Sequence, residues 1–325
     1  MLSAKISALI NGVYEVGEIL GHGTFGVVYK GLHRELLTPV AIKVFSRGDH
    51  ISKNFLNESK LIFRLNHPHV TQALDIFYTD QCYAIVFEYM NQGDLRAYLE
   101  QVGSLSEYQA LMIAAQVTTG LRYIHSQGII HRDLKPENIL ISAHEQEIIY
   151  KLTDFNISSY SKDRKMSPSE HGSPMYMAPE QFYEYFDQRV DVYALGVILY
   201  EMLCGTPPFV GAVQEVINAH IHQAPDFSRL QVKAKTLSVL QKMLHKDPQQ
   251  RYANSGDLLV DLEQILGLLT LPQGPMLQSL LQKRADLYFL KYLDQSLWPG
   301  YVTALNIKQF KTRYDTPERG RDSGE

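Results

Sequence analysis

An eight-residue stretch near the middle of the chain gathers three side chains of types that do chemistry. Residues 131–138 are His-Arg-Asp-Leu-Lys-Pro-Glu-Asn, with a potential base at Asp133, a cation at Lys135 and a metal-binding type of amide at Asn138. Pro136 has a fixed φ and no amide hydrogen, which disfavours a regular helix. We therefore predict a loop between an amphipathic helix and a short apolar strand, where catalytic residues are commonly placed.

A glycine-rich turn near the N-terminus is a second candidate. Residues 21–26 are Gly-His-Gly-Thr-Phe-Gly, a pattern found in dinucleotide-binding folds, in kinases and in ordinary hairpins. A dinucleotide-binding turn opens into a helix, whereas residues 27–31 are β-branched and aromatic and predict a strand. With another strand predicted over 14–20, the glycines should lie at the tip of a hairpin, where bare backbone could cover phosphates.

The stretch at 131–138 resembles the catalytic loop of eukaryotic-type protein kinases. The resemblance implies that Asp133 is the catalytic base and that Lys135 offsets charge on the transferred phosphoryl group. It also implies that Asn138 and Asp154 hold Mg²⁺ against the phosphates of ATP, since hard oxygen ligands suit a hard cation. Lysine at 135, in place of the Ala-Ala-Arg type of loop, implies serine/threonine substrates.

The same resemblance implies an ATP site. Lys43 lies in an apolar run predicted as a strand, and would bind phosphates and pair with Glu58 on a helix predicted over 52–66. Either residue could instead lie on a solvated face. Backbone groups of Glu88 and Met90 would bind the adenine edge behind the gatekeeper Phe87. The implied ATP contacts are Gly21, His22, Gly23, Thr24, Phe25, Gly26, Val28, Ala41, Lys43, Glu58, Glu88, Met90 and Leu140.

The family's fold is α+β and bilobal, with a small β-rich N-lobe and a larger, mainly helical C-lobe. The expected divisions are an N-terminal lead 1–11 and a kinase domain 12–266, comprising N-lobe 12–87, hinge 88–93 and C-lobe 94–266, then a helical extension 267–325 ending in a disordered tail. Ser104-x-x-Glu107 predicts a capping box for the helix before the loop, and residues 190–203 predict a buried helix. The extension could dock on the kinase domain or on a partner through 276–315.

The activation segment, residues 154–180, contains one departure from the family and several candidate phosphorylation sites. Asn156 replaces the glycine after Asp-Phe, which predicts a restricted switch because asparagine tolerates positive φ. The alternative is a pseudokinase scaffold that binds nucleotide without efficient transfer. Ser169 is the predicted phosphosite, to be paired by Arg132; Ser167 and Ser173 are further candidates, although serines are also common in plain loops. We expect Ser173 mainly to support Asp133.

Several charged residues outside the reaction centre also match the family. Asp191 is predicted to hold the catalytic-loop backbone, and Arg251 to pair with Glu180. The positions of Asp94, Glu137 and Glu201 imply a preference for basic residues upstream of the acceptor in protein substrates. Each of these acids could equally be a surface or cap carboxylate.

The amino-acid composition restricts the class of protein but does not indicate a function. With 325 residues, 45% hydrophobic and 20% charged, the chain is of ordinary globular composition. The net charge of −4 gives no argument for a nucleic-acid partner. Cys82 and Cys204 lack close-spaced partners and predict buried thiols in a reducing compartment. No apolar run is long enough for a membrane span, so we expect an intracellular protein, cytoplasmic or nuclear.

Overall fold

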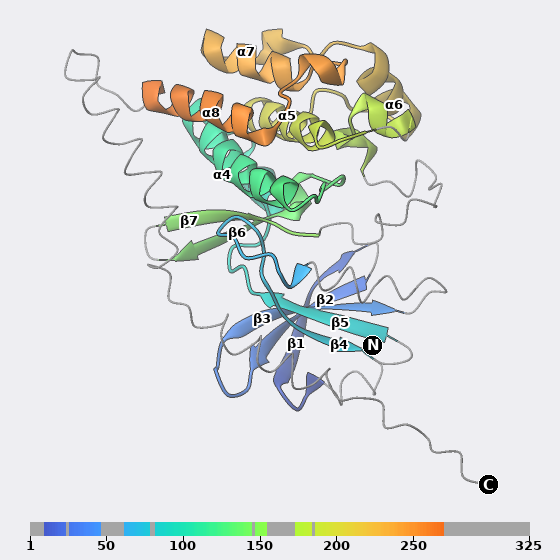
Figure 1. The fold of residues 1–325 in the computed structure, drawn as a ribbon, viewed down its shortest axis with the longest axis vertical. Coiled ribbons are helices and arrows are strands. Elements are labelled where there is room, and N and C mark those ends of the chain that lie inside the picture. The colour runs from blue at the N-terminus through green and yellow to red at the C-terminus, as the bar shows by residue number, and fades with distance from the viewer. Residues whose placement is uncertain are drawn as a thin grey trace, which may run out of the picture.

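The computed structural model describes residues 10–23, 26–46, 62–78, 82–144, 147–154, 173–183 and 186–269. They form the two expected lobes, an N-terminal sheet and a C-terminal group of helices (Figure 1). The predictions that fall on Thr24, Phe25, Glu58, Asn156, Ser167, Ser169 and the extension beyond 269 lie outside these residues.

The N-lobe is built on one antiparallel sheet of order β1-β2-β3-β5-β4. Its strands are β1 (Tyr14–Gly23), β2 (Gly26–His33), β3 (Pro39–Ser46), β4 (Ala73–Tyr78) and β5 (Cys82–Glu88). The predicted glycine-tipped hairpin is confirmed, because Gly23 is the register partner of Gly26, and β1 runs to Gly23 rather than ending at 20. Gly26 is required by close approach: a Cβ there would lie 2.1 Å from the Val44 carbonyl oxygen.

The C-lobe contains a hairpin and six α-helices among the described residues. The hairpin is β6 (Ile139–His144) with β7 (Glu147–Leu152), and the helices are α3 (Leu95–Val102), α4 (Glu107–Ser126), α5 (Arg189–Cys204), α6 (Val213–His222), α7 (Ala234–Met243) and α8 (Ser255–Leu269). Short 3-10 turns lie at Pro136–Asn138, Pro174–Tyr176, Pro179–Tyr183, Phe227–Arg229 and Pro248–Gln250. Helix α8 continues past the expected limit of 266.

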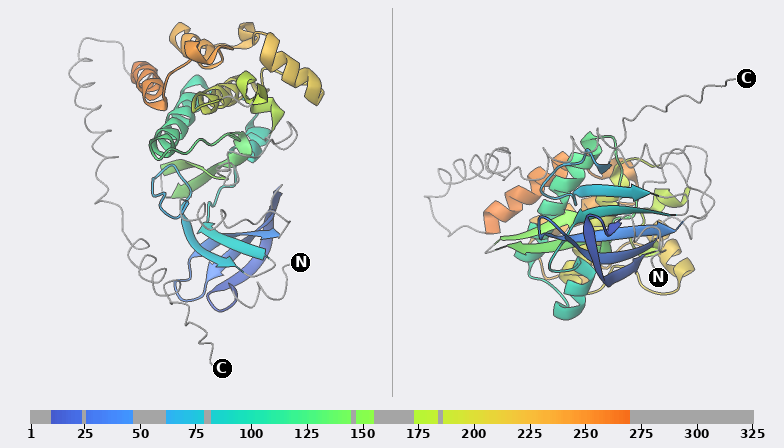
Figure 2. Two further views of the ribbon diagram at one scale, coloured as in Figure 1. Left: turned by 45° about the vertical axis from the view of Figure 1, so that its right-hand side comes forward. Right: turned by 90° about the horizontal axis from the view of Figure 1, so that it is seen from below.

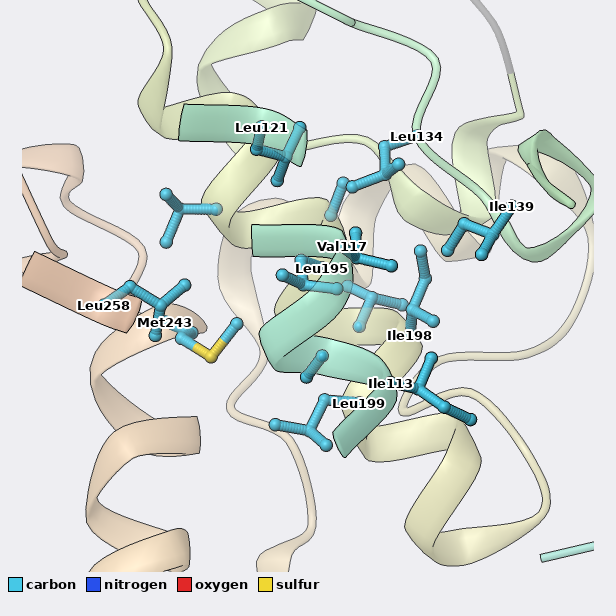
Figure 3. Packing of buried hydrophobic residues seen from close by; sticks show 14 of the residues in the cluster. Ile113, Val117, Leu121, Leu134, Ile139, Leu195, Ile198, Leu199, Met243 and Leu258 are labelled. Atoms are coloured by element: carbon cyan, nitrogen blue, oxygen red, sulfur yellow. The ribbon is translucent and has the colours of Figure 1, made fainter. Parts of the chain in front are cut away.

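Packing between α4 and α5 forms the centre of the C-lobe core. Ile113, Val117 and Leu121 of α4 face Leu195 and Ile198 of α5 (Figure 3), and all five are almost completely buried. Burying each such side chain is worth roughly 1.5–3 kcal/mol. The predicted burial of α5 is confirmed by thirteen buried residues, so the elements on either side of the catalytic loop share a rigid base. Cys204, at the end of α5, is a free thiol but only half-buried, not buried as predicted.

The predicted capping box at Ser104 and Glu107 is wrong by two residues. Helix α4 begins at Glu107, and Ser106 is its cap: Ser106 Oγ accepts from the Gln109 amide, while Gln109 Oε1 accepts from the Ser106 amide. The amide of the buried Leu105 donates to the Met202 carbonyl at 2.7 Å. This contact holds the chain before Ser106 against α5, so the helix cannot start at the earlier serine.

The two lobes are joined along the hairpin β6–β7, which lies between the sheet and the helices (Figures 1 and 2). On one side, Leu152 donates to the His69 carbonyl at 3.0 Å, and Thr71 donates to the Leu152 carbonyl at 2.8 Å. On the other side, Ile141 donates to the Gly93 carbonyl at 2.8 Å. Within the described residues, no helix has both the length and the apolarity to cross a membrane.

Candidate active site

The loop that carries Asp133 is tethered to the core by one buried carboxylate. Asp191, at the start of α5, accepts from the His131 amide at 2.8 Å and the Arg132 amide at 2.9 Å, as predicted. Arg132 has φ +67°, a left-handed conformation that is uncommon for a residue other than glycine, at the point where Asp191 binds the loop. Burial opposes ionisation of Asp191, yet the hydrogen bond and charge of His125, 2.7 Å away, hold the pKa of the carboxyl below its usual range. An ionised Asp191 therefore fixes the loop.

The Asp133 side chain is oriented by three other groups. Asn138 Nδ2 donates to the Asp133 carbonyl at 2.7 Å and to Oδ2 at 3.3 Å. Lys135 Nζ lies 3.2 Å from the same Oδ2, and the Ser173 backbone amide donates to Oδ1 at 3.3 Å. The predicted contact of Ser173 with Asp133 is confirmed, through its amide. The carboxylate is thus held from both the loop and the far end of the activation segment.

Asn138 and Asp154, the two residues predicted to hold a divalent cation, both carry hard oxygen atoms. Because both Asn138 hydrogen bonds to Asp133 use the amide nitrogen, the Asn138 Oδ1 is left as the ligand atom. Asp154 follows β7 with φ +59° and carries the second ligand group. Amide and carboxylate oxygens of this kind fit a magnesium-type ion.

Lys43 contacts this second ligand directly. Its Nζ lies 2.5 Å from Asp154 Oδ1, and the lysine side chain is 10% exposed. Lys43 is the register partner of Val28 in the neighbouring strand, which places it close behind the glycine hairpin. The expected partner Glu58 lies outside the described residues; within the part of the chain that the structure describes, Lys43 pairs with Asp154. The Lys43 ammonium group, positioned between the glycine hairpin and Asp154, is suited to binding phosphates.

The predicted hinge has an ion pair that sequence reasoning missed. The Glu88 carboxylate accepts from Lys151 Nζ at 2.7 and 2.8 Å and from the Gln72 amide at 2.8 Å. Lys151 is three residues before Asp154, so this pair joins the predicted hinge to the strand that leads to Asp154. Met90 is buried.

The apolar residues among the predicted ATP contacts come from both lobes. Val28, Ala41 and Leu140 are each half-buried, as residues facing a ligand space would be. Leu140 also forms a β-bridge with Asp94. Phe87, the predicted gatekeeper, is half-buried at the end of β5 and is the register partner of Ala41.

The acids expected to select basic substrates have partners within the chain. Asp94 caps α3, accepting from the Ala97 amide at 2.9 Å. Glu137 and Glu201 both bind Arg96 of α3. No sequence motif indicated Arg96, because its partners Glu137 and Glu201 lie 41 and 105 residues away in the chain. The only available signal was its position at the start of a helix just after the predicted hinge.

The predicted pair of Arg251 with Glu180 is confirmed. Arg251 Nη1 and Nη2 donate to the two carboxylate oxygens at 2.6 and 2.8 Å, and Nε donates to the His245 carbonyl at 2.6 Å. The Arg251 side chain is fully buried. This pair anchors the end of the activation segment to the C-lobe.

Comparisons with known proteins agree with this geometry. Residues 14–261 match the family model described as protein kinase domain. The chain is 32% identical over 260 residues to serine/threonine-protein kinase ATG1b of Arabidopsis thaliana, covering 77% of this chain and 36% of that protein. It is 34% identical over 271 residues to a probable serine/threonine-protein kinase of Clostridium perfringens, covering 80% and 39%.

A shorter relative is matched over most of its own length. The chain is 32% identical over 219 residues to myosin light chain kinase A of Dictyostelium discoideum, covering 66% of this chain and 74% of that protein. By contrast, the Arabidopsis and Clostridium relatives are matched over little more than a third of their lengths.

Proposed function

This chain belongs to the eukaryotic-type serine/threonine protein kinases, and we propose that it transfers the γ-phosphoryl group of ATP to serine or threonine hydroxyls of protein substrates. The observation that carries the proposal is the Asp133 carboxylate, fixed by Asn138, Lys135 and the Ser173 amide in a loop tethered to the core. Preorganised charge and positioning supply most of the catalysis in this reaction class.

The chemistry follows from these positions. The acceptor oxygen attacks the γ-phosphorus, its proton passes to Asp133, and the bond between the γ-phosphorus and the bridging oxygen breaks to leave ADP. Lys135 offsets the charge on the moving phosphoryl group. The backbone groups of Glu88 and Met90 hold the adenine edge, while the residue 21–26 turn covers the phosphates.

We propose Mg²⁺ as the cation, held by Asn138 and Asp154. When bound, it would neutralise charge on the ATP phosphates. Lys43 would then share its charge between Asp154 and the phosphates.

Regulation and placement are proposals on the same basis. Phosphorylation of Ser169 or Ser167 would supply an anion for Arg132, whose guanidinium lies 5.1 Å from the Phe186 ring centroid. The segment 276–315 would dock on the kinase domain or a partner, and the protein would work in the cytoplasm. A preference for basic substrates would require Glu137 or Glu201 to exchange Arg96 for a substrate cation.

The decisive experiment compares Asp133→Asn with the wild-type protein, using labelled ATP, magnesium and a generic protein acceptor. Because the amide cannot take the proton, transfer should fall by about 10²-fold or more, while binding of an ATP analogue persists. Phosphoamino-acid analysis should show serine or threonine.

The matched control is Asp187→Asn, the same change at an exposed carboxylate. Asp187 lies just before α5 and contacts Arg189, the first residue of that helix. It should keep wild-type transfer. Equal transfer by wild type and Asp133→Asn would overturn the proposal, and nucleotide binding with no transfer by any of the proteins would favour the pseudokinase scaffold.

A further inference from the structure

Arg96 on α3 is bound simultaneously by residues from three other elements. Its Nη1 donates to Glu201 Oε1 of α5 at 2.7 Å, and its Nε donates to Glu137 Oε1 in the Pro136–Asn138 turn at 3.1 Å. Its Nη2 contacts the hydroxyl of Tyr176 in the Pro174–Tyr176 turn. That hydroxyl donates in turn to Glu201 Oε2 at 2.7 Å. The planar guanidinium has the donor geometry that such a multiple contact needs.

This cluster is connected to Asp133 along two chain segments. Glu137 follows Asp133 by four residues in the same loop. Tyr176 follows Ser173 by three residues, and the Ser173 amide is bound to Asp133. An acceptor hydroxyl that reaches Asp133 must bring its neighbouring residues across this surface. Glu137 is 43% exposed and Arg96 is 23% exposed, whereas Glu201 is only 5% exposed.

The charges decide what this surface can select. Without Arg96, Glu137 and Glu201 would place two negative charges next to the reaction centre, one of them buried and strongly attractive to a cation. With Arg96 the net charge is −1, and both Glu201 oxygens are already hydrogen-bonded. To reach the Glu201 oxygens, a substrate arginine would have to displace the Arg96 guanidinium, which already donates to Glu201 and to Glu137.

We propose that Arg96 is a specificity-determining residue of this kinase: it fills the acidic pair Glu137–Glu201 from within the chain, so that the enzyme gains no affinity from an arginine upstream of the acceptor. The inference rests on the proposed function and refines its substrate class. The wild-type enzyme should therefore use acceptor sites with a neutral or a basic residue at that position equally well. Removing Arg96 opens a guanidinium-sized space lined by two carboxylates and the Tyr176 hydroxyl, and a substrate arginine becomes the natural occupant.

The test uses a pair of acceptor peptides that differ only in carrying arginine or alanine upstream of the serine, with the arginine moved through successive positions. For the wild-type protein, the ratio of kcat/KM between arginine and alanine peptides should stay near one. For Arg96→Ala, the ratio should rise by about tenfold or more at one position, the effect of about 1.4 kcal/mol of new charge-assisted binding. Arg122→Ala, at an exposed arginine of α4, should leave the ratio unchanged.

The measurements separate this inference from the kinase activity itself. Phosphorylation of the alanine peptide reports on activity alone, and the ratio between peptides reports on Arg96 alone. Fluorescence anisotropy gives the same ratio from peptide binding, even without transfer. A strong arginine preference in the wild-type protein would overturn the inference, whether or not Arg96→Ala folds. An unchanged ratio in a folded Arg96→Ala protein would overturn it as well.

Discussion

His220 on α6 is a buried histidine whose two ring nitrogens both have partners. The Met175 carbonyl lies 3.0 Å from Nε2 and can only accept, so Nε2 carries the proton. Nδ1 then accepts from the Tyr193 hydroxyl at 2.9 Å. Burial, together with the charge of Lys246, lowers the pKa of His220 to about 4. The ring is therefore neutral at pH 7, and only the neutral ring can both donate to the Met175 carbonyl and accept from the Tyr193 hydroxyl.

Acid should destabilise the fold partly through this ring. The unfolded chain takes up the proton near pH 6.5, so stability is full above that pH and is lost as pH falls toward 4. His220→Gln keeps a donor and an acceptor without titrating. Between pH 7.5 and 5 the wild type should lose about 1–2 kcal/mol more than this variant in urea unfolding.

The control for this experiment lies two residues away. His222, on the same helix, is exposed, and His222→Gln should retain the wild-type pH dependence. His67 and His69 also have lowered pKa values, about 3 and about 4, chiefly because of burial, so every variant will keep some acid sensitivity. An identical pH dependence in His220→Gln and wild type would contradict the prediction.

Contacts within one loop could be predicted from proximity, and two long-range pairs, Asp191 with the loop amides and Arg251 with Glu180, from the resemblance to the family. Contacts that neither source specifies were missed. Asp133, Lys135 and Asn138 lie in one loop, and their mutual contacts follow from that proximity. The pairing of Arg96 with Glu201 spans 105 residues, and no local pattern specifies it. The Lys43 contact with Asp154 also depends on how the lobes meet.

At the scale of elements, the Glu88–Lys151 ion pair joins the hinge to β7. The Lys151 side chain is 9% exposed and that of Glu88 is 28% exposed, so water screens this pair less than a surface pair. Lys151→Ala should free the Glu88 side chain and loosen the hinge backbone proposed to bind adenine. We expect the Kd for ATP with magnesium to rise about three- to tenfold, or roughly 0.7–1.4 kcal/mol, measured by titration calorimetry.

An exposed lysine provides the comparison for this hinge prediction. Lys235 lies on α7, away from the hinge, and is exposed. Lys235→Ala should bind ATP as the wild type does. Wild-type affinity in Lys151→Ala would mean that the hinge backbone is held without the ion pair.

The limits of elements depend on contacts that periodicity does not encode. Residues 190–203 were predictable as a buried helix because they are apolar nearly all round. The start of α4 was not, because Ser104 and Ser106 are both good capping residues. The choice between them is made by the Leu105 contact with Met202, which exists only in the folded C-lobe.

At the scale of the whole molecule, the Glu180–Arg251 pair is a determinant of folding. Arg251→Ala would leave a carboxylate without its buried partner and free the three backbone carbonyls that Arg251 binds. The expected loss is about 3–5 kcal/mol of unfolding free energy, seen as a much lower Tm and yield. Protein that remains folded should keep its specific activity.

Arg229→Ala is the matched control for this change. Arg229 is exposed and donates to the Thr206 hydroxyl at 3.0 Å, so its removal should alter Tm little. If Arg251→Ala melted near the wild-type Tm but lost activity, the Glu180–Arg251 pair would be needed for catalysis rather than for the stability of the fold.

Two of the attachments between the N-lobe and the C-lobe consist of backbone hydrogen bonds, and together they bear on how the lobes can move. In one, Gly93 at the end of the predicted hinge is hydrogen-bonded to Ile141. In the other, the His69–Thr71 segment is hydrogen-bonded to Leu152. Gly120 of α4 holds the second attachment close, since a Cβ there would lie 2.6 Å from the His69 carbonyl oxygen. These two backbone attachments define a line, and we expect the N-lobe to tilt mainly about it, with the Lys43–Asp154 contact as a further link between the lobes. We expect such a tilt to widen and narrow the space between the residue 21–26 turn and Asp133, where the ATP phosphates are proposed to bind.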